Sequence, residues 1–450
     1  MSMSTAAPVI KWQPSRVPIG ASSFEVLVEQ ASGVTATLEV TGSGSIPAKV
    51  KQLLDNLDGT SWLTIEPTWG MPPHGPANLV LKNDHGSDSK ELTLVKVAFA
   101  KPPVSIAVLG VTPWLSIGKF GNALRIFGLD TAAKALWHID YSDFAPKGMR
   151  VDALKGQVMA VPTSLINAGA SVFFSVPPGS QQDLVRVSVD APGNDYAGNT
   201  LLFGKPWGIV SVAALGAGAL DQDRTLVLVG DANKALYTCI YTVSSDSGEA
   251  CKQSFSLPAT PISLLVQPLD KSGLGQVVAL GAGSLKVLAR NGAGSLTDRT
   301  SQAQLAKPTD LIAITTGDMD GDSDIDLVGV TASAVIVFLN DGSGVFSEIQ
   351  TPIANIAVSR LAVGDVDKDG RPDVLLTEQT AGKVLVLLNA SGDQTESKGR
   401  LLGPVEVGVA VGANGALTLD GQDTKGSGRR LIWHDPTTQN LSVADNATLP

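Results

Sequence analysis

The feature that most constrains the fold is a repeat, which runs from about residue 100 to the end of the chain. It is clearest in three segments: SLKVLARNGAGSLTD (284–298), AVIVFLNDGSGVFSE (334–348) and KVLVLLNASGDQTES (383–397). Their asparagines, Asn291, Asn340 and Asn389, align with a spacing of 49 residues. A period in the upper forties with several short strands per repeat is typical of β-propellers, with one blade per repeat.

The repeat also predicts how many blades there are and how the ring closes. Dividing roughly 345 residues by a period of about 48 gives seven blades, with six or eight left open because the first two units are degenerate. We expect the segment NLSVADNATL (440–449) to pair with a strand near residue 105. Such pairing would leave no open sheet edge.

Residues 1–100 lack this repeat and show a different pattern of apolar and polar residues. Segments such as SSFEVLVEQ, VTATLEVTG and ELTLVKVAF alternate apolar and polar residues, as half-buried antiparallel strands do. The chain is therefore predicted to be all-β, with a β-sandwich over 1–100, a linker at KPPV (101–104) and a propeller over 101–450. One short helix is expected within 45–57, with Ser45 as its cap and Pro47 in its first turn. Its apolar stripe would be Val50, Leu53, Leu54 and Leu57.

The stretch SWLTIEPTWGMPPHGPANLVLKN (61–83) resembles bacterial Ig-like modules of the BACON type, which carry a similar Trp-Leu-strand-Pro-Gly pattern before their last strands. The resemblance covers about forty residues and implies an Ig-like topology for the sandwich.

Two acidic loops carry the clearest chemistry: GDMDGDSDIDLVGV (317–330) and GDVDKDGRPDVLLT (364–377). Carboxylates at alternate positions of a tight loop converge and repel one another, unless a hard divalent cation that takes six to eight oxygen ligands offsets their charge. Positions 1, 3, 5 and 9 are Asp318, Asp320, Asp322 and Asp326 in the first loop, and Asp365, Asp367, Asp369 and Asp373 in the second. Position 7 is Asp324 or Arg371, and Arg371 could contribute only its main-chain carbonyl.

An EF-hand begins in the same way, but it does not fit. Position 12, which needs a bidentate Glu, holds Gly329 in the first loop and Leu376 in the second. The residues that follow are typical of a strand and not of an exiting helix.

The pattern G-D-x-[DN]-x-D-x-x-x-D-[LIV] before a strand resembles the FG-GAP/VCBS repeats of integrin-α-like propellers, and LNDGSGVF (339–346) resembles the strand end of that family. The resemblance implies that the eight aspartates at positions 1, 3, 5 and 9 are side-chain ligands of two structural Ca²⁺ ions. Looser loops near Asp221, Asp270 and Asp420 lack the alternate acids, and we expect no metal there.

Charge and cysteine content restrict the partners and the compartment. The net charge of −10 argues against a nucleic-acid binder, and no apolar run is long enough to insert into a membrane. No secretory signal is visible in MSMSTAAPVIKW. Cys239 and Cys251 flank a short polar turn, and a disulfide between them is expected, which would indicate an oxidising compartment. A secreted, cell-surface or virion-associated protein is the resulting expectation.

No catalytic motif is found: H-E-x-x-H, G-x-S-x-G and a Walker loop are all missing from the sequence. The leading hypothesis is therefore a non-enzymatic binding or adhesion protein whose propeller face recognises a protein partner or a surface. A carbohydrate-binding lectin is the first alternative, although Trp114, Trp207 and Trp433 lack the regular spacing of repeated sugar platforms. A calcium-dependent polysaccharide lyase or hydrolase is the second alternative.

Overall fold

The structure is a computed structural model, and the residues it describes lie between 6 and 449. They are 6–56, 58–70, 74–99, 104–107, 115–120, 123–130, 135–142, 145–153, 171–175, 184–188, 197–201, 209–215, 224–242, 247–248, 251–272, 274–291, 295–305, 310–353, 356–391, 398–412, 416–419, 430–435, 437–438 and 440–449, with the strands alone given over 104–227. Every regular element in them is a β-strand, so the predicted all-β class is confirmed. Those residues hold no helix of the length and apolarity needed to cross a membrane.

The N-terminal part forms one eight-stranded sheet in the order β1-β3-β6-β5-β4-β7-β8-β2. Its strands are β1 (Val9–Trp12), β2 (Arg16–Pro18), β3 (Phe24–Glu29), β4 (Thr35–Val40), β5 (Gly44–Asp55), β6 (Thr60–Pro67), β7 (Gly75–Asn83) and β8 (Gly86–Val95). Consecutive strands β1 and β2 lie at opposite ends of this order, and the Ile10 N–H donates across to Asp88 Oδ2 at 2.8 Å. The sheet therefore curls until its ends meet around a core that includes Phe24, Leu38 and Leu79. The Ig-like assignment and the boundary at residue 100 remain predictions.

The predicted helix within 45–57 is wrong, because residues 44–55 form strand β5. Ile46, Ala48 and Val50 alternate with exposed residues, and β5 pairs with β4 on one side and β6 on the other. The i, i+3, i+4 spacing that suggested a helix arises near the bulge between Gln52 and Leu54. A period of two over the first half of the segment outweighs an apparent helical stripe when neighbouring strands supply partners on both sides.

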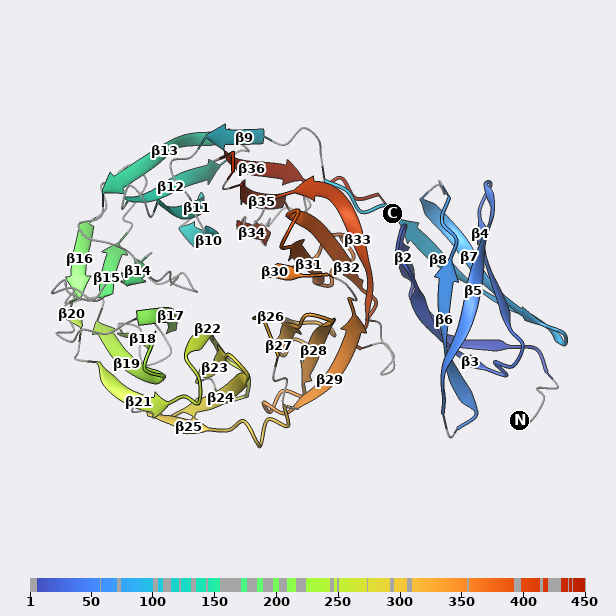
Figure 1. Ribbon diagram of the computed structural model, residues 1–450, viewed down its shortest axis with the longest axis horizontal. Coiled ribbons are helices and arrows are strands. Elements are labelled where there is room, and N and C mark those ends of the chain that lie inside the picture. Colours follow the sequence, from blue (N-terminus) through green and yellow to red (C-terminus); the bar gives the residue numbers. More distant parts are fainter. Residues whose placement is uncertain are drawn as a thin grey trace.

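The rest of the chain forms small antiparallel sheets arranged around a ring (Figure 1). In chain order the strands are β9 (Val104–Ala107), β10 (Leu115–Phe120), β11 (Ala123–Asp130), β12 (Ala135–Ser142), β13 (Ala145–Ala153), β14 (Ser171–Ser175), β15 (Leu184–Ser188), β16 (Ala197–Leu201), β17 (Ile209–Leu215), β18 (Arg224–Asp231), β19 (Ala235–Thr242), β20 (Ser247–Gly248), β21 (Lys252–Ser256), β22 (Pro261–Gln267), β23 (Gln276–Gly281), β24 (Ser284–Arg290), β25 (Leu296–Asp298), β26 (Ala313–Gly317), β27 (Asp326–Val330), β28 (Ala334–Asn340), β29 (Phe346–Pro352), β30 (Val358–Gly364), β31 (Asp373–Glu378), β32 (Lys383–Asn389), β33 (Leu401–Ala410), β34 (Ala416–Leu419), β35 (Arg430–Asp435) and β36 (Asn440–Asp445). The sheets are β10–β13, β14–β16, β17–β21, β22–β25, β26–β29, β30–β33 and β34–β36 with β9. In each, the first strand lies toward the centre of the ring, as in a β-propeller.

The last sheet closes the ring as the sequence predicts. β36 pairs antiparallel with β9, so that Val443 lies opposite Val104. The chain continues past this pairing, because Lys96 bridges to Leu449 and Phe99 to Asn446. The C-terminal residues therefore lie where the ring meets the N-terminal sheet (Figure 1).

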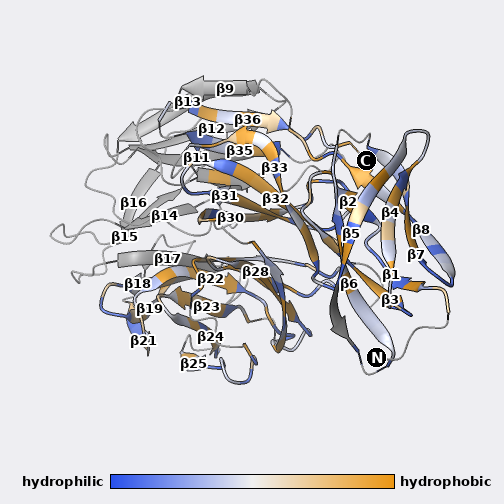
Figure 2. Cartoon of the chain, turned by 45° about the vertical axis from the view of Figure 1, so that its right-hand side comes forward, coloured by the Kyte–Doolittle hydropathy of each residue, from blue (hydrophilic) through white to orange (hydrophobic). Residues whose placement is uncertain are grey.

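Neighbouring sheets of the ring pack face to face through apolar residues. One cluster joins Val328 and Val337 of one sheet to Val374 and Leu387 of the next, all fully buried. Figure 2 shows hydrophobic residues along β22, β32 and β35. Strands buried on both sides read as continuous apolar runs, which explains segments such as AVIVFLN and KVLVLLN.

The N-terminal sheet is packed against β33 of the ring. Leu402 of β33 belongs to the apolar core of the N-terminal sheet. The Arg400 guanidinium lies 3.7 Å from the centre of the Trp62 ring and pairs with the Glu25 carboxylate. Beside these contacts is a cleft of about 570 Å³, lined from both parts. Nothing in the local sequence pattern predicts this junction.

Candidate metal centres in two acidic loops

The two acidic loops occupy equivalent places in consecutive sheets. The first joins β26 to β27, and the second joins β30 to β31. Gly317 pairs with Asp326 and Gly364 with Asp373, so both loops leave and re-enter their sheets in the same register. The flanking strands therefore hold position 9 of each loop at the start of a buried strand.

Both loops also share an unusual backbone. Positions 4 and 6 have positive φ in each: Gly321 (81°) and Ser323 (74°) in the first, Lys368 (63°) and Gly370 (92°) in the second. Each loop places glycine at one of these positions and an ordinary residue at the other. Left-handed residues at alternate positions turn the chain sharply, which directs the intervening side chains to a common point.

The aspartates at positions 1 and 9 hold this shape with hydrogen bonds. Asp318 accepts the N–H groups of Gly321 (2.8 Å) and Ser323 (3.0 Å), as Asp365 accepts those of Asp369 and Gly370 (both 3.1 Å). The hydrogen bonds to position 9 come from equivalent residues in the two loops. Asp326 accepts from Met319 (2.6 Å) and Asn340 (2.7 Å), and Asp373 accepts from Val366 (2.6 Å) and Asn389 (2.8 Å).

The structure gathers three of the predicted ligands in each loop. The grouped carboxylates, whose oxygens lie within 4.8 Å of one another, are Asp318, Asp320 and Asp326 in the first loop and Asp365, Asp367 and Asp373 in the second. The other predicted ligands, Asp322, Asp324, Asp369 and Arg371, lie outside these groups. Their main-chain N–H groups cap the loop: Asp324 donates to Asp322 Oδ1 and Arg371 to Asp369 Oδ1.

Burial makes the grouped carboxylates costly to ionise. Burial raises the pKa of Asp326 to about 7, against the two N–H bonds that lower it. Burial raises the pKa of Asp367 to about 6, with a further rise from Asp369 and an opposing effect of Arg16. Burial and the nearby Asp367 charge raise the pKa of Asp373 well above its ordinary value. Burial likewise raises the pKa of Asp322.

This donor set fits a hard cation. Positive charge favours the ionised form of three carboxylates so close together, two of them buried in the second loop, and oxygen donors suit Ca²⁺. The carboxylates at positions 1, 3 and 9 would hold the ion, with positions 5 and 7 available to complete its six to eight oxygens.

A third loop, Leu269–Gln276 between β22 and β23, shows the same frame with a single acid, Asp270. The Leu269 N–H donates to Gln276 Oε1 at 2.6 Å, as Met319 donates to Asp326 and Val366 to Asp373. Gln276 therefore occupies position 9, and Asp270 occupies position 3. Asp270 therefore corresponds to Asp320 of the first acidic loop and not to Asp318.

The asparagine alignment needs a similar correction. β24, β28 and β32 end at Arg290, Asn340 and Asn389, so Asn291 corresponds to Asp341 and not to Asn340. A hydrogen bond confirms this, because Asn291 accepts from Ser295 N–H as Asp341 accepts from Val345 N–H. A single matching residue type is a weak guide to register, which strand pairing determines.

Asn340 and Asn389 tie adjacent sheets together, a role that sequence reasoning did not assign. Both are buried, and each amide bridges two carbonyls: Asn340 donates to Leu269 (2.9 Å) and Ile325 (3.0 Å), and Asn389 to Met319 (2.8 Å) and Pro372 (3.0 Å). The Asn446 amide bonds the Val366 carbonyl in the same manner. In all three cases the acceptor in the preceding sheet is position 2 of the loop. The sequence signal for this role is an asparagine that recurs at the end of an apolar strand, in AVIVFLN and KVLVLLN.

The aspartate at position 3 of each acidic loop is paired with a distant basic residue. Asp320 Oδ2 lies 2.6 Å from Lys398 Nζ, and Asp367 Oδ2 lies 3.0 Å from Arg16 Nη1. Both aspartates are nearly inaccessible, with 3 % and 2 % of their side chains exposed. Neither partner could have been identified from spacing, because they are 78 and 351 residues away.

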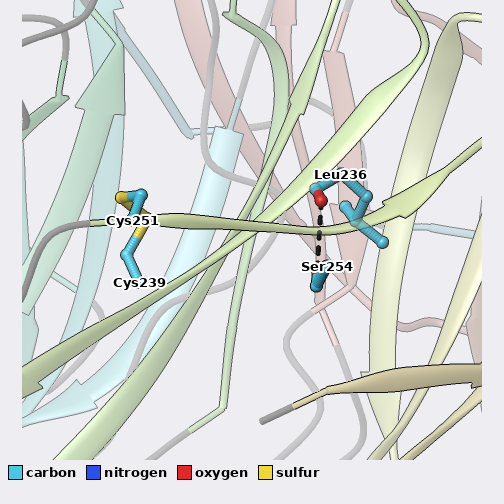
Figure 3. Close-up of a disulfide and its surroundings, with 4 residues drawn as sticks. All are labelled: Leu236, Cys239, Cys251 and Ser254. Atoms are coloured by element: carbon cyan, nitrogen blue, oxygen red, sulfur yellow. Dashed lines mark hydrogen bonds between the residues drawn. A yellow bond between two sulfur atoms is a disulfide. The ribbon is translucent and has the colours of Figure 1, made fainter.

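The two cysteines are joined in the structure. Cys239 of β19 and Cys251, just before β21, form a disulfide between paired strands (Figure 3). Ser254 Oγ donates to the Leu236 carbonyl on the same pair of strands at 3.0 Å.

Several other sequence candidates are not brought into a site. Trp433 is buried (5 % exposed) in β35 and offers no exposed platform for a sugar. Trp114, Trp207, Asp221 and Asp420 lie outside the described residues, as does most of the KPPV linker. Within the described part of the chain, the two acidic loops are the only groups of three or more His, Cys, Asp or Glu that could hold a metal.

Comparison with known proteins gives one family match. Residues 318–376 match the FG-GAP-like repeat, a span that starts at position 1 of the first acidic loop and includes the whole of the second. The FG-GAP repeat that the sequence suggested is thus confirmed for this part of the chain, whereas calcium binding and likeness to integrin-α propellers stay predictions. No curated protein matches.

Similar solved structures are remote. The BP39L lectin of Burkholderia pseudomallei is 14 % identical, with 77 % of this chain and 98 % of that one covered and a TM-score of 0.47. A lectin of Agrocybe aegerita that recognises non-reducing terminal N-acetylglucosamine is 13 % identical, with 76 % and 91 % covered and a TM-score of 0.40. A protein of unknown function from Bacteroides thetaiotaomicron is 11 % identical, with 98 % of both chains covered and a TM-score of 0.36. Likeness at this level assigns no function to the chain.

Proposed function

We propose that this chain is a non-enzymatic binding protein, built on a seven-bladed propeller that two Ca²⁺ ions stabilise. The observation that carries the proposal is the pair of acidic loops, in which the same positive-φ positions, the same two hydrogen bonds to position 9 and the same three carboxylates recur in consecutive sheets. Two matched sites inside the scaffold, at the junctions of strands, suit ions that stabilise a fold.

A structural role follows from how position 9 is used. Asp326 joins its own loop, through Met319, to the end of β28, through Asn340. A cation that neutralises this carboxylate favours its ionised form, which accepts both hydrogen bonds strongly. Since the ion binds only the folded loop, its binding free energy adds to the stability of the blade.

The partner is proposed to be a protein or a surface outside the cell. The disulfide favours an oxidising compartment, and the loops between propeller strands are the usual place for recognition. An Ig-like N-terminal sheet would then act as a connector that holds the propeller at a fixed angle. The lectin and lyase alternatives gain no support from the described residues, where Trp433 is buried and acidic loops are the only metal-type clusters.

Thermal unfolding with excess Ca²⁺ and with EGTA tests the proposal. We expect calcium to raise the melting temperature, because each site contributes about 2.7 kcal/mol when the free ion is at 100 times its Kd. The double variant Asp318→Asn, Asp365→Asn should lose this response, whereas Asp270→Asn, which removes the lone acid of the Leu269–Gln276 loop, should keep it. Equal melting temperatures of the wild type in both solutions would contradict the proposal. A glycan array run in parallel tests the lectin alternative, since specific sugar binding would replace the protein-partner assignment.

A further inference from the structure

Arg16 is the residue through which the N-terminal sheet reaches the second acidic loop. Its Nη1 donates to the main-chain carbonyl of Asp367 at 2.9 Å and lies 3.0 Å from the Asp367 carboxylate. One nitrogen of the guanidinium thus contacts both the backbone and the side chain of position 3. Charge-assisted bonds of this kind are among the stronger ones in proteins.

The backbone of Arg16 is itself rigidly held. It starts β2, which pairs in parallel with β8 so that Arg16 lies opposite Thr93. Main-chain bonds from Thr93 to Ser15 (2.8 Å) and from Ile19 to Val95 (2.9 Å) lie on either side of it. The neighbouring Val17 is fully buried in the core of the sheet. The guanidinium therefore projects from a fixed base, and it can fix the orientation of what it contacts.

We propose that Arg16 is a positioning residue of the second calcium site, so that calcium binding there and docking of the N-terminal sheet stabilise each other. This inference rests on the proposed calcium binding. Arg16 holds the Asp367 carboxylate in the group with Asp365 and Asp373, so the ion does not have to order it. Loss of such an outer partner typically lowers metal affinity by about 10- to 100-fold. Because linkage is reciprocal, calcium strengthens the docking by the same factor by which docking strengthens calcium binding.

The first loop provides an internal contrast. Its position-3 aspartate, Asp320, is contacted by Lys398, which belongs to the ring. Lys398 Nζ contacts the carboxylate alone, whereas Arg16 also holds the main-chain carbonyl. Calcium at the first loop should therefore be independent of the N-terminal sheet.

Calorimetric calcium titration of the full chain tests the inference. In an Asp318→Asn background, where only the second loop binds, we expect Arg16→Gln to weaken affinity by about 10- to 100-fold. Arg16→Lys should recover part of this loss because it keeps the charge. Lys11→Gln is the matched control, since Lys11 lies on β1, at the other end of the strand order of the same sheet, and pairs with the exposed Glu29, away from both loops. Lys398→Gln should leave the second loop unaffected.

A second readout follows the docking itself. Hydrogen exchange of the amides at the start of β33, which the N-terminal sheet covers, should slow on calcium addition in the wild type but not in Arg16→Gln. If the wild type binds no calcium, the proposed function fails. If the wild type binds two ions and Arg16→Gln keeps the affinity of the second loop within about twofold, with unchanged exchange, the inference alone is overturned.

Discussion

The acidic loops and the Leu269–Gln276 loop use different side chains to accept the same main-chain hydrogen bond. In all three, the main-chain N–H at position 2 is buried at the junction of two strands and needs an acceptor. Gln276 provides a neutral one, and its amide also bonds Ser272 Oγ at 3.3 Å. Asp326 and Asp373 provide charged acceptors, and burial raises the pKa of both.

The difference shows that the frame of the loop does not require a metal. The neutral Gln276 is enough to hold the turn, so the aspartate at position 1 and the charge at position 9 are not needed for folding of the loop alone. The carboxylates of the acidic loops repel one another; Lys398 and Arg16 offset part of this repulsion, and a bound cation would offset more. The comparison therefore separates the hydrogen-bonding role of position 9 from its proposed role as a ligand.

The largest effect is expected from Asp326→Ala. The variant leaves the N–H groups of Met319 and Asn340 without an acceptor, which costs about 2–4 kcal/mol of unfolding free energy even in EGTA. It also removes the calcium contribution of this loop. Denaturant unfolding in EGTA and in calcium measures both parts. A loss seen only in calcium would mean that the hydrogen bonds contribute nothing.

Asp326→Gln gives the first acidic loop the glutamine that the Leu269–Gln276 loop has at position 9. The variant separates hydrogen bonding at this position from calcium binding. The amide oxygen can still accept from Met319, so the loss in EGTA should be smaller than for Asp326→Ala. With calcium at 100 times its Kd, the contribution of about 2.7 kcal/mol from this loop should be missing. The same denaturant series gives the answer. A full calcium response would show that Asp326 is not a ligand.

Asn340→Ala tests how much the hydrogen bonds of Asn340 between neighbouring sheets contribute to the free energy of unfolding. The buried amide donates to two carbonyls and accepts from the N–H groups of Gly342 (3.1 Å) and Gly344 (3.0 Å). We expect a loss of about 2 kcal/mol, equal in calcium and in EGTA, since no ligand is removed. Asn291→Ala, one residue beyond the strand end, is the control and should cost less. A loss confined to calcium would place Asn340 in the metal site.

The smallest effect is expected from Lys368→Gly. Lys368 has a φ of 63°, a conformation that costs an ordinary residue more than glycine. The variant should gain about 0.5–1 kcal/mol of unfolding free energy. Lys271 is at position 4 of the Leu269–Gln276 loop. Lys271→Gly should instead lose stability, because Lys271 is not among the positive-φ residues. Thermal unfolding of the pair checks the sign, and a loss for Lys368→Gly would contradict the strain argument.

The sequence by itself determined those features that depend on local spacing. Alternating carboxylates before an apolar run predicted both acidic loops, and the structure brings positions 1, 3 and 9 of each together. Period-two patterns and the repeat predicted an all-β chain whose last strand closes the ring with β9. These predictions held because neighbouring residues alone decide which side chains share a loop or a face.

Only the tertiary structure decided the features that depend on pairing across the chain. Strands β4 and β6 make residues 44–55 a strand, although part of that segment has helical spacing. Hydrogen bonds between strands show that Arg290, and not Asn291, occupies the position in its repeat that Asn340 and Asn389 occupy in theirs. The partners of Asp320 and Asp367 come from Lys398 and Arg16, far away in sequence. A long-range contact leaves no periodic trace in a single sequence, because its position follows from how whole sheets pack.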